Sequence, residues 1–260
     1  MSSVSSTSGT GELAHQVNCL LDDNRGIRLR ALNTLIKDVE RATIKIPLSN
    51  GDGKDSTVTT QSILDALMPV VNKIFSDSIE RHRELSIRLV SNLVRLICIV
   101  PSQISQTPSI PSARFSSDDE RHLRTLLLRY APPLVSALVS RFAQEGGENS
   151  EELRLQLLQL LHTMVRELGS PTEVNHLDEQ CEATLSSHLD DFVRILVRAL
   201  GDKFPDLRKE ACRVVYILSL SPLMRPFVHL QAESLFRALL PVLGHQHAKV
   251  FPNEFLKKVK

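Results

Sequence analysis

Two groups of histidine and cysteine residues have the types that could bind a metal ion. His245 and His247 lie two positions apart near the C-terminal end, and His176, Cys181 and His188 lie in and beside a loop-like segment. A zinc site takes about four nitrogen, sulfur or oxygen ligands, and no cysteine or carboxylate stands at ligand spacing from the first pair. We expect His245 and His247 to be solvated or to serve repeat packing, and the second group to be a chance grouping. No metal or cofactor is predicted.

Other catalytic chemistry also lacks a basis in the sequence. The chain contains no GxSxG, Walker A, GxGxxG or HExxH pattern, and its serines concentrate in a tail and in loops. Those patterns place a nucleophile, a phosphate-binding loop or a metal-bound water, and each needs its residues at fixed spacing. We therefore expect a protein without enzymatic activity.

Charge and hydropathy exclude two classes of partner. Lys and Arg total 31 against 30 for Asp and Glu, so a formal net charge of +1 creates no whole-chain field for nucleic acid or anionic membrane. The longest apolar run, at 93–100, is too short to span a bilayer. The N-terminus lacks the apolar segment of a signal peptide, and the 4 cysteines show no CxxC pair. We expect a cytoplasmic protein with reduced cysteines, whose partners are proteins.

One basic run is a candidate site for an acidic partner. It consists of Arg81, His82, Arg83, Arg88 and Arg95. Glu80 and Glu84 are interleaved with it, which favours a solvated helix face with ion pairs between neighbouring turns.

Helices are the elements that would position these residues. The stretch 202–220 has apolar residues at the spacing of one buried helical stripe: Leu207, Ala211, Val214, Val215 and Leu218. Pro205 suits the first turn of this helix, where a backbone N–H has no partner. Aromatic residues make up only 4% of the chain, fewer than a sheet protein usually contains. The sequence predicts an all-α protein.

Similar stripes recur in pairs along the chain. The predicted pairs are 12–21 with 27–39, 62–75 with 84–100, 121–142 with 151–168, and 188–203 with 206–220, and 234–250 begins a fifth. Pro132 and Pro133 should kink or split the helix that contains them, and Gly169 and Pro171 should end the next one. Because each hairpin has two apolar faces to cover, neighbouring hairpins must stack. The predicted fold is an α-solenoid of HEAT-like helical hairpin repeats.

The domain boundaries follow from composition. We expect a disordered Ser/Thr/Gly-rich tail at 1–11, a repeat solenoid at 12–250 and an atypical C-terminal tail at 251–260. Turn-forming residues predict loop insertions within the solenoid at 46–60, 101–117 and 169–180.

A set of acidic and arginine residues marks the repeats. Aligned turns and second helices give Asp23, Asp77 and Asp202 with Arg28, Arg88, Arg154 and Arg208; the third repeat offers Glu148 or Glu151 as its acid. We expect the acid of one turn to meet the arginine of a neighbouring second helix. These residues are interpreted as a structural ladder, and no partner-binding residue is assigned.

The segment DKFPDLRKEA, with its turn Asp, its Pro, its Leu-Arg pair and its Ala, resembles the HEAT repeat. More narrowly, GDKFPDLRKEAC at 201–212 and HLQAESLFRALLPVLGHQHAKV at 229–250 look like the HEAT-repeat dynein axonemal assembly factors. The resemblance implies a non-catalytic cytoplasmic scaffold or co-chaperone-like factor for preassembly of axonemal dynein arms in motile cilia and flagella. It implies intermediate or heavy dynein chains and chaperones as partners.

The sequence departs from that family after Val250. An arginine and a second helix would be expected there, but FPNEFLKKVK follows, which suggests a truncated or spliced end. The apolar face of the helix at 234–243 should then be exposed, or loosely covered by Phe251 and Phe255. The alternative function is a generic HEAT-repeat protein-binding scaffold, such as a transport-receptor-like or tubulin-binding solenoid. The acidic bias of the turns argues against tubulin.

Overall fold

The computed structural model describes residues 8–42, 60–103, 117–142, 147–171 and 175–243. Within these ranges every regular element is a helix. Four long helices are the second members of hairpins: α2 (Arg25–Ala42), α5 (Glu80–Gln103), α7 (Glu151–Gly169) and α10 (Pro205–Leu220). The all-α, solenoid-type fold class is thus confirmed, as stacked hairpins within each of the two compact units described below.

The first members of the hairpins are more often broken. α1 (Ser8–Cys19) and α6 (Ser117–Phe142) are continuous. The others are interrupted: α3 (Thr60–Leu67), η1 (Met68–Val70) and α4 (Val71–Phe75); α8 (Asn175–Ser187) and α9 (Leu189–Leu200); α11 (Arg225–Val228), η2 (His229–Gln231) and α12 (Ala232–Leu243).

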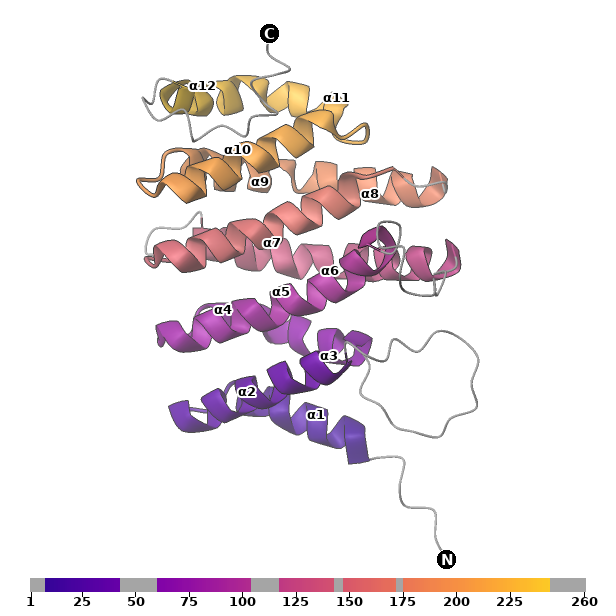
Figure 1. Cartoon of the computed structure of the whole chain (residues 1–260), viewed down its shortest axis with the longest axis vertical. Coiled ribbons are helices and arrows are strands. Elements are labelled where there is room, and N and C mark those ends of the chain that lie inside the picture. Colours follow the sequence, from indigo (N-terminus) through magenta and orange to yellow (C-terminus); the bar gives the residue numbers. More distant parts are fainter. Residues whose placement is uncertain (1–7, 43–59, 104–116, 143–146, 172–174, 244–260) are drawn as a thin grey trace, which may run out of the picture. The chain divides into compact units, whose positions relative to one another are not determined.

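The chain forms two compact units, residues 1–122 and 123–260. In the first unit α2 lies beside α5, while α1 and α4 pack on these second helices (Figure 1). In the second unit α7 lies along α10, and α9 packs against both α10 and α12. Second helices therefore stack on second helices, and first helices on first helices, within each unit.

The helical stripes form the cores of the units. Leu157 and Leu161 of α7 are fully buried, as are Leu207 and Leu218 of α10. Pro205 stands at the start of α10, as expected from its missing N–H. Packing of these apolar stripes fixes the helices against one another, and this in turn fixes the turns that join them.

The structure corrects several expected boundaries. The last residues of the 1–11 tail belong to α1, which starts at Ser8. The segment 169–180 is only partly a loop, because α8 starts at Asn175 and buries Leu177, Cys181 and Leu185 at four-residue spacing. This apolar stripe lies partly within the expected loop. It shows that the first member of this hairpin begins with α8, before the helix that was expected to start at 188.

The other expected insertions lie mostly outside the described residues. Thr60 opens α3, Gln103 closes α5 and Ser117 opens α6, so only the edges of 46–60 and 101–117 are described. The tail at 251–260 lies wholly outside the described residues.

Two helical segments contain internal prolines. Pro132 and Pro133 do not split α6, which continues to Phe142. Their neighbours Leu134 and Val135 are at most 1% exposed, so this part of α6 is buried in the core. Pro69 lies within η1, where the expected helix at 62–75 divides into three short elements.

Candidate functional site

In the turn before each second helix, three residues before the helix starts, stands an acidic residue that is followed six positions later by an arginine. The four pairs are Asp22 with Arg28, Asp77 with Arg83, Glu148 with Arg154, and Asp202 with Arg208. In every turn the carboxylate accepts a hydrogen bond from the backbone N–H two residues on, at 2.7 Å in Asn24, 2.8 Å in Ile79, 3.1 Å in Ser150 and 2.9 Å in Phe204. This bond fixes the chain at the point where it enters the helix.

The arginine of each pair binds back to its own turn. Its Nη1 atom donates to the carbonyl oxygens of the acidic residue and of the residue after it. These distances are 2.7 and 3.0 Å for Arg28, 2.9 and 3.4 Å for Arg83, 3.2 and 2.8 Å for Arg154, and 2.7 and 2.9 Å for Arg208. One edge of the guanidinium group therefore holds the turn together.

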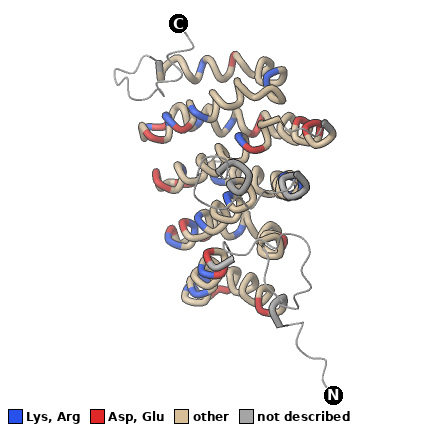
Figure 2. Tube along the Cα trace, turned by 45° about the vertical axis from the view of Figure 1, so that its right-hand side comes forward, with Lys and Arg blue, Asp and Glu red and all other residues tan. Residues whose placement is uncertain are grey.

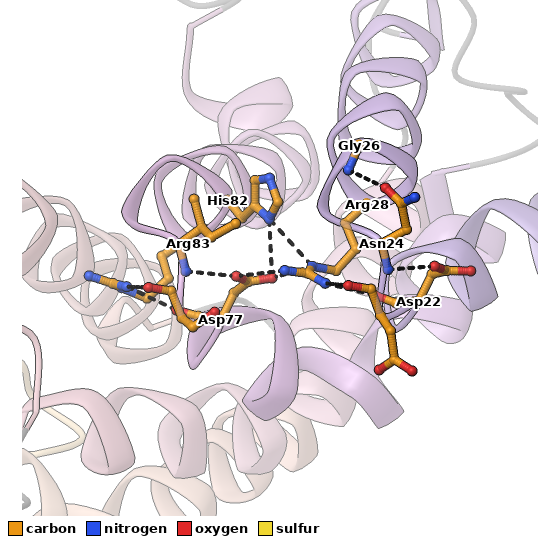
Figure 3. Close-up of polar contacts among 10 residues, drawn as sticks. Asp22, Asn24, Gly26, Arg28, Asp77, His82 and Arg83 are labelled. Atoms are coloured by element: carbon orange, nitrogen blue, oxygen red, sulfur yellow. Dashed lines mark hydrogen bonds and ion pairs between the residues drawn. The ribbon is translucent and has the colours of Figure 1, made fainter.

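The other edge of the guanidinium group reaches the acid of the next turn in the stack. Arg28 Nε lies 2.7 Å from Asp77 Oδ2 in the first unit (Figure 3), and Arg154 Nε lies 3.0 Å from Asp202 Oδ2 in the second. The Nη2 atoms add contacts of 3.4 Å and 3.1 Å to the Oδ1 atoms. These side chains are 10–17% exposed, so each two-point contact is partly shielded from water.

A histidine joins the contact in the first unit. His82 is 4% exposed, and its Nδ1 lies 3.3 Å from Asp77 Oδ2 and 3.4 Å from Arg28 Nε (Figure 3). Burial raises the pKa of Asp77, but hydrogen bonds from the Ile79 N–H, Arg28 and His82 outweigh it and hold that pKa below its usual value. Asp77 is therefore held as a carboxylate.

A second polar contact joins α7 and α10 in the middle of their interface. Glu210 is 4% exposed, and its carboxylate contacts His162 Nδ1 and lies 2.8 Å from Arg213 Nη1. Burial raises the pKa of Glu210, yet hydrogen bonds from His162 and Arg213 lower it below the usual range. The sequence gives little indication of this contact, because its only local signal is a glutamate on the buried side of an apolar stripe.

The ends of α7 and α10 are joined as well. Ser221 Oγ donates to the Gly169 carbonyl oxygen at 2.7 Å, in a buried position. A Cβ atom at residue 169 would lie 3.0 Å from that hydroxyl oxygen, so glycine permits the close approach.

Two residues of the expected ladder are misplaced by the sequence alignment. Asp22, rather than Asp23, caps the first turn, and Asp23 contributes its backbone carbonyl to Arg28. Arg83, rather than Arg88, binds the second turn, while Arg88 lies 3.6 Å from Glu40 with both side chains more than half exposed. The constant six-residue interval from acid to arginine was the signal that identifies the correct residues.

The other candidate residues do not gather into a site. In the basic run, Arg81 pairs with Glu84 at 2.6 Å, while His82 and Arg83 take part in turn contacts. Within the described ranges no three His, Cys, Asp or Glu side chains converge as metal ligands, and this includes His176, Cys181 and His188. His245 and His247 lie outside the described residues, so the absence of a metal remains a prediction.

The cysteines and helix lengths add two observations. Cys98, Cys181 and Cys212 are buried thiols, and burial raises the pKa of Cys212 to about 11. No single helix in the described ranges is long and apolar enough to cross a membrane; only the bent pair of residues 205–220 and 225–242 meets the length and composition test.

Comparison with known proteins gives matches along most of the chain. The family described as "Dynein axonemal assembly factor 5-like, TPR repeats" matches residues 121–253. Its description names TPR repeats where the sequence suggested HEAT repeats, and both are stacked helical hairpins. Among solved structures, the CEP104 TOG domain covers 91% of this chain and is itself 97% covered, at 12% identity and a TM-score of 0.35, which is only a loose similarity.

Named relatives match with higher identity. Dynein axonemal assembly factor 5 of Xenopus laevis is 30% identical over 242 residues, which are 93% of this chain and 22% of the relative. The Mus musculus protein of the same name is 38% identical over 141 residues, which are 50% of this chain and 15% of the relative. The chain thus spans less than a quarter of the length of these relatives. The family match and the Xenopus alignment together show that the chain belongs to the dynein axonemal assembly factor 5-like family.

Proposed function

We propose that this chain is a non-catalytic scaffold that acts in the cytoplasm during preassembly of axonemal dynein arms for motile cilia and flagella. The observation that carries the proposal is the 30% identity to Xenopus laevis dynein axonemal assembly factor 5 across 93% of the chain. The proposed clients are intermediate or heavy dynein chains, held together with chaperones.

The chemistry of the described residues agrees with a binding role. The acid and arginine turns are occupied with internal contacts between helices, and these contacts hold surfaces in place rather than activate a nucleophile or a water. Acidic and basic residues lie side by side within each unit, separated by long uncharged stretches (Figure 2). Because the formal net charge is only +1, we expect binding through local contacts with proteins that depends only modestly on salt.

Affinity purification from ciliated cells tests the proposal directly. The tagged chain should enrich dynein chains or their chaperones over a tagged control carrying both Leu157→Ala and Leu161→Ala, which lose packing in the core of α7. Depletion of the endogenous protein should remove dynein arms while leaving the microtubule doublets in electron micrographs.

Two results would overturn the assembly role. Dynein arms could persist at normal density after depletion. The purified chain could instead capture tubulin or a nuclear-transport GTPase without any dynein component, which would favour the general solenoid scaffold.

A further inference from the structure

The two second helices of the second unit end on the same dipeptide. α7 is followed by Ser170 and Pro171, and α10 is followed by Ser221 and Pro222. Both serines are extended, with φ −82° and ψ 126° at Ser170 and φ −61° and ψ 120° at Ser221, which is the conformation that a following proline favours. The backbone is thus alike at the two positions, so a difference in their chemistry must come from the surroundings of the hydroxyl groups.

The two hydroxyl groups differ in exposure. Ser221 is 5% exposed, and its Oγ donates to the Gly169 carbonyl oxygen at 2.7 Å and accepts from the Met224 N–H at 3.3 Å. Ser170 is exposed, and its Oγ donates to the Arg166 carbonyl oxygen at 2.7 Å, at the surface of the last turn of α7. Ser221 therefore joins two helix ends, whereas Ser170 presents its hydroxyl at the surface.

A serine hydroxyl directly before an exposed proline is the acceptor that proline-directed protein kinases modify. Such kinases bind an extended chain, and proline suits the position after the serine because it has no backbone N–H to leave unpaired. Pro171 is exposed, as Ser170 is. The dipeptide also lies at a helix end, where the last carbonyl groups have no helical partner and local opening costs least. The end of α7 thus has the features that such a kinase needs.

A guanidinium group lies beside this position. Arg124 of α6 donates from Nη1 to the Ser170 carbonyl oxygen, and its side chain is 10% exposed. The same Nη1 lies 3.9 Å from the Asp178 carboxylate of α8. A phosphate on Ser170 adds about −1.5 to −2 charge, which the negative end of the α7 dipole disfavours and which Arg124 offsets. The site therefore combines an accessible hydroxyl with a cation that can bind the phosphorylated product.

We propose that Ser170 is a phosphorylation site for a proline-directed kinase and that its phosphate binds Arg124. MgATP is the co-substrate. The bond between Ser170 Oγ and the γ-phosphorus forms, the bond from that phosphorus to its bridging oxygen breaks, ADP leaves, and the hydroxyl proton passes to the catalytic Asp of the kinase. The hydrogen bond to the Arg166 carbonyl loses its donor, and the exit of α7 gains an anionic group. The proposal rests on the structure of the second unit and is independent of the proposed cellular function.

Incubation of the whole 260-residue chain with a purified cyclin-dependent or mitogen-activated protein kinase and MgATP tests this proposal. Mass spectrometry that assigns each modified residue should show Ser170 phosphorylated about tenfold or more faster than Ser221, because the Ser221 hydroxyl must first leave its buried hydrogen bond. The peptides 164–177 and 215–228 carry the same two serines without this packing. They are the controls, and the preference for Ser170 should disappear in them.

Two further measurements examine the proline and the arginine. Pro171→Ala should remove most of the modification at Ser170, whereas the matched change Pro222→Ala should leave it unchanged. Phosphorus NMR titration should give the phosphate of the folded chain a lower second pKa than that of the phosphorylated peptide 164–177, because the peptide lacks Arg124.

Three outcomes would contradict the proposal. Ser170 that stays unmodified in the folded chain, while the peptide 164–177 is modified, would show that the end of α7 is closed to the kinase. Equal modification of Ser170 and Ser221 in the folded chain would show that exposure does not select the site. A phosphate pKa that is equal in the chain and in the peptide would show that Arg124 does not bind the phosphate.

Discussion

Loss of the Asp202 carboxylate should weaken the joint between α7 and α10. Asp202→Ala removes two interactions, the cap on the Phe204 N–H at 2.9 Å and the ion pair with Arg154 at 3.0 Å. A lost cap costs about 0.5–2 kcal/mol, and a charged hydrogen bond contributes about 1.5–3 kcal/mol. We expect the free energy of unfolding to fall by about 2–5 kcal/mol.

Asp202→Asn separates the two interactions. Asparagine retains an acceptor for the cap but loses the charge that faces Arg154, so this change should cost less than Asp202→Ala. Urea denaturation of both variants, of Arg154→Ala and of the double variants measures the coupling between the residues as a double-mutant cycle. The pair is only 14–17% exposed, so we expect a coupling free energy of about 1 kcal/mol or more.

The exposed pair Glu233 and Arg237 provides the comparison. It is joined at 2.6 Å, but its side chains are 76% and 77% exposed, and such helix pairs contribute about 0.3–0.5 kcal/mol. A coupling for Asp202 and Arg154 no larger than for this pair would refute the argument that shielding at the turn makes the contact stabilising.

Three further predictions concern the same interface. Leu157→Ala or Leu161→Ala should each lower the free energy of unfolding by about 2–5 kcal/mol in urea denaturation, and a loss below about 0.5 kcal/mol at both would contradict their full burial. Glu210 has a pKa lowered from its usual 4.5, so the stability it contributes is present above that pH and is lost as the pH falls through its folded pKa. Glu210→Gln should therefore flatten the acid limb of a stability–pH curve, and an unchanged limb would show that Glu210 is not held as a carboxylate. Gly169→Ala places a Cβ 3.0 Å from Ser221 Oγ and should lower the thermal midpoint, whereas pairing it with Ser221→Ala should recover part of the loss; no recovery would place the strain elsewhere.

The sequence predicts the hairpins well because their signal is local. A stripe such as Leu207, Ala211 and Leu218 needs only the helical period to be recognised, and these residues are fully buried in α10. α8 is hard to recognise because Ser, Pro and Thr precede it and Asn is its first residue, so its short stripe merges with the turn-forming composition.

The polar contacts were harder to predict because their partners come from different hairpins. Arg83 and Arg88 both stand near the start of α5; Arg83 is the turn arginine, six residues after Asp77, and Arg88 lies on the surface. His162 and Glu210 are 48 residues apart and meet only after α7 and α10 have stacked. Local pattern identifies the elements, while the register between them is set by packing.

The arginines that bind two successive turns also limit where the chain can change length. Because Arg28 and Arg154 each hold their own turn and the next one, the turns before α2, α5 and α10 have little freedom to lengthen, and each acid stands only two or three residues after the preceding helix. The long segments 43–59 and 104–116, by contrast, both follow second helices, α2 and α5. Sequence length can thus vary at the exits of the second helices while the spacing of successive turns within a unit stays constant.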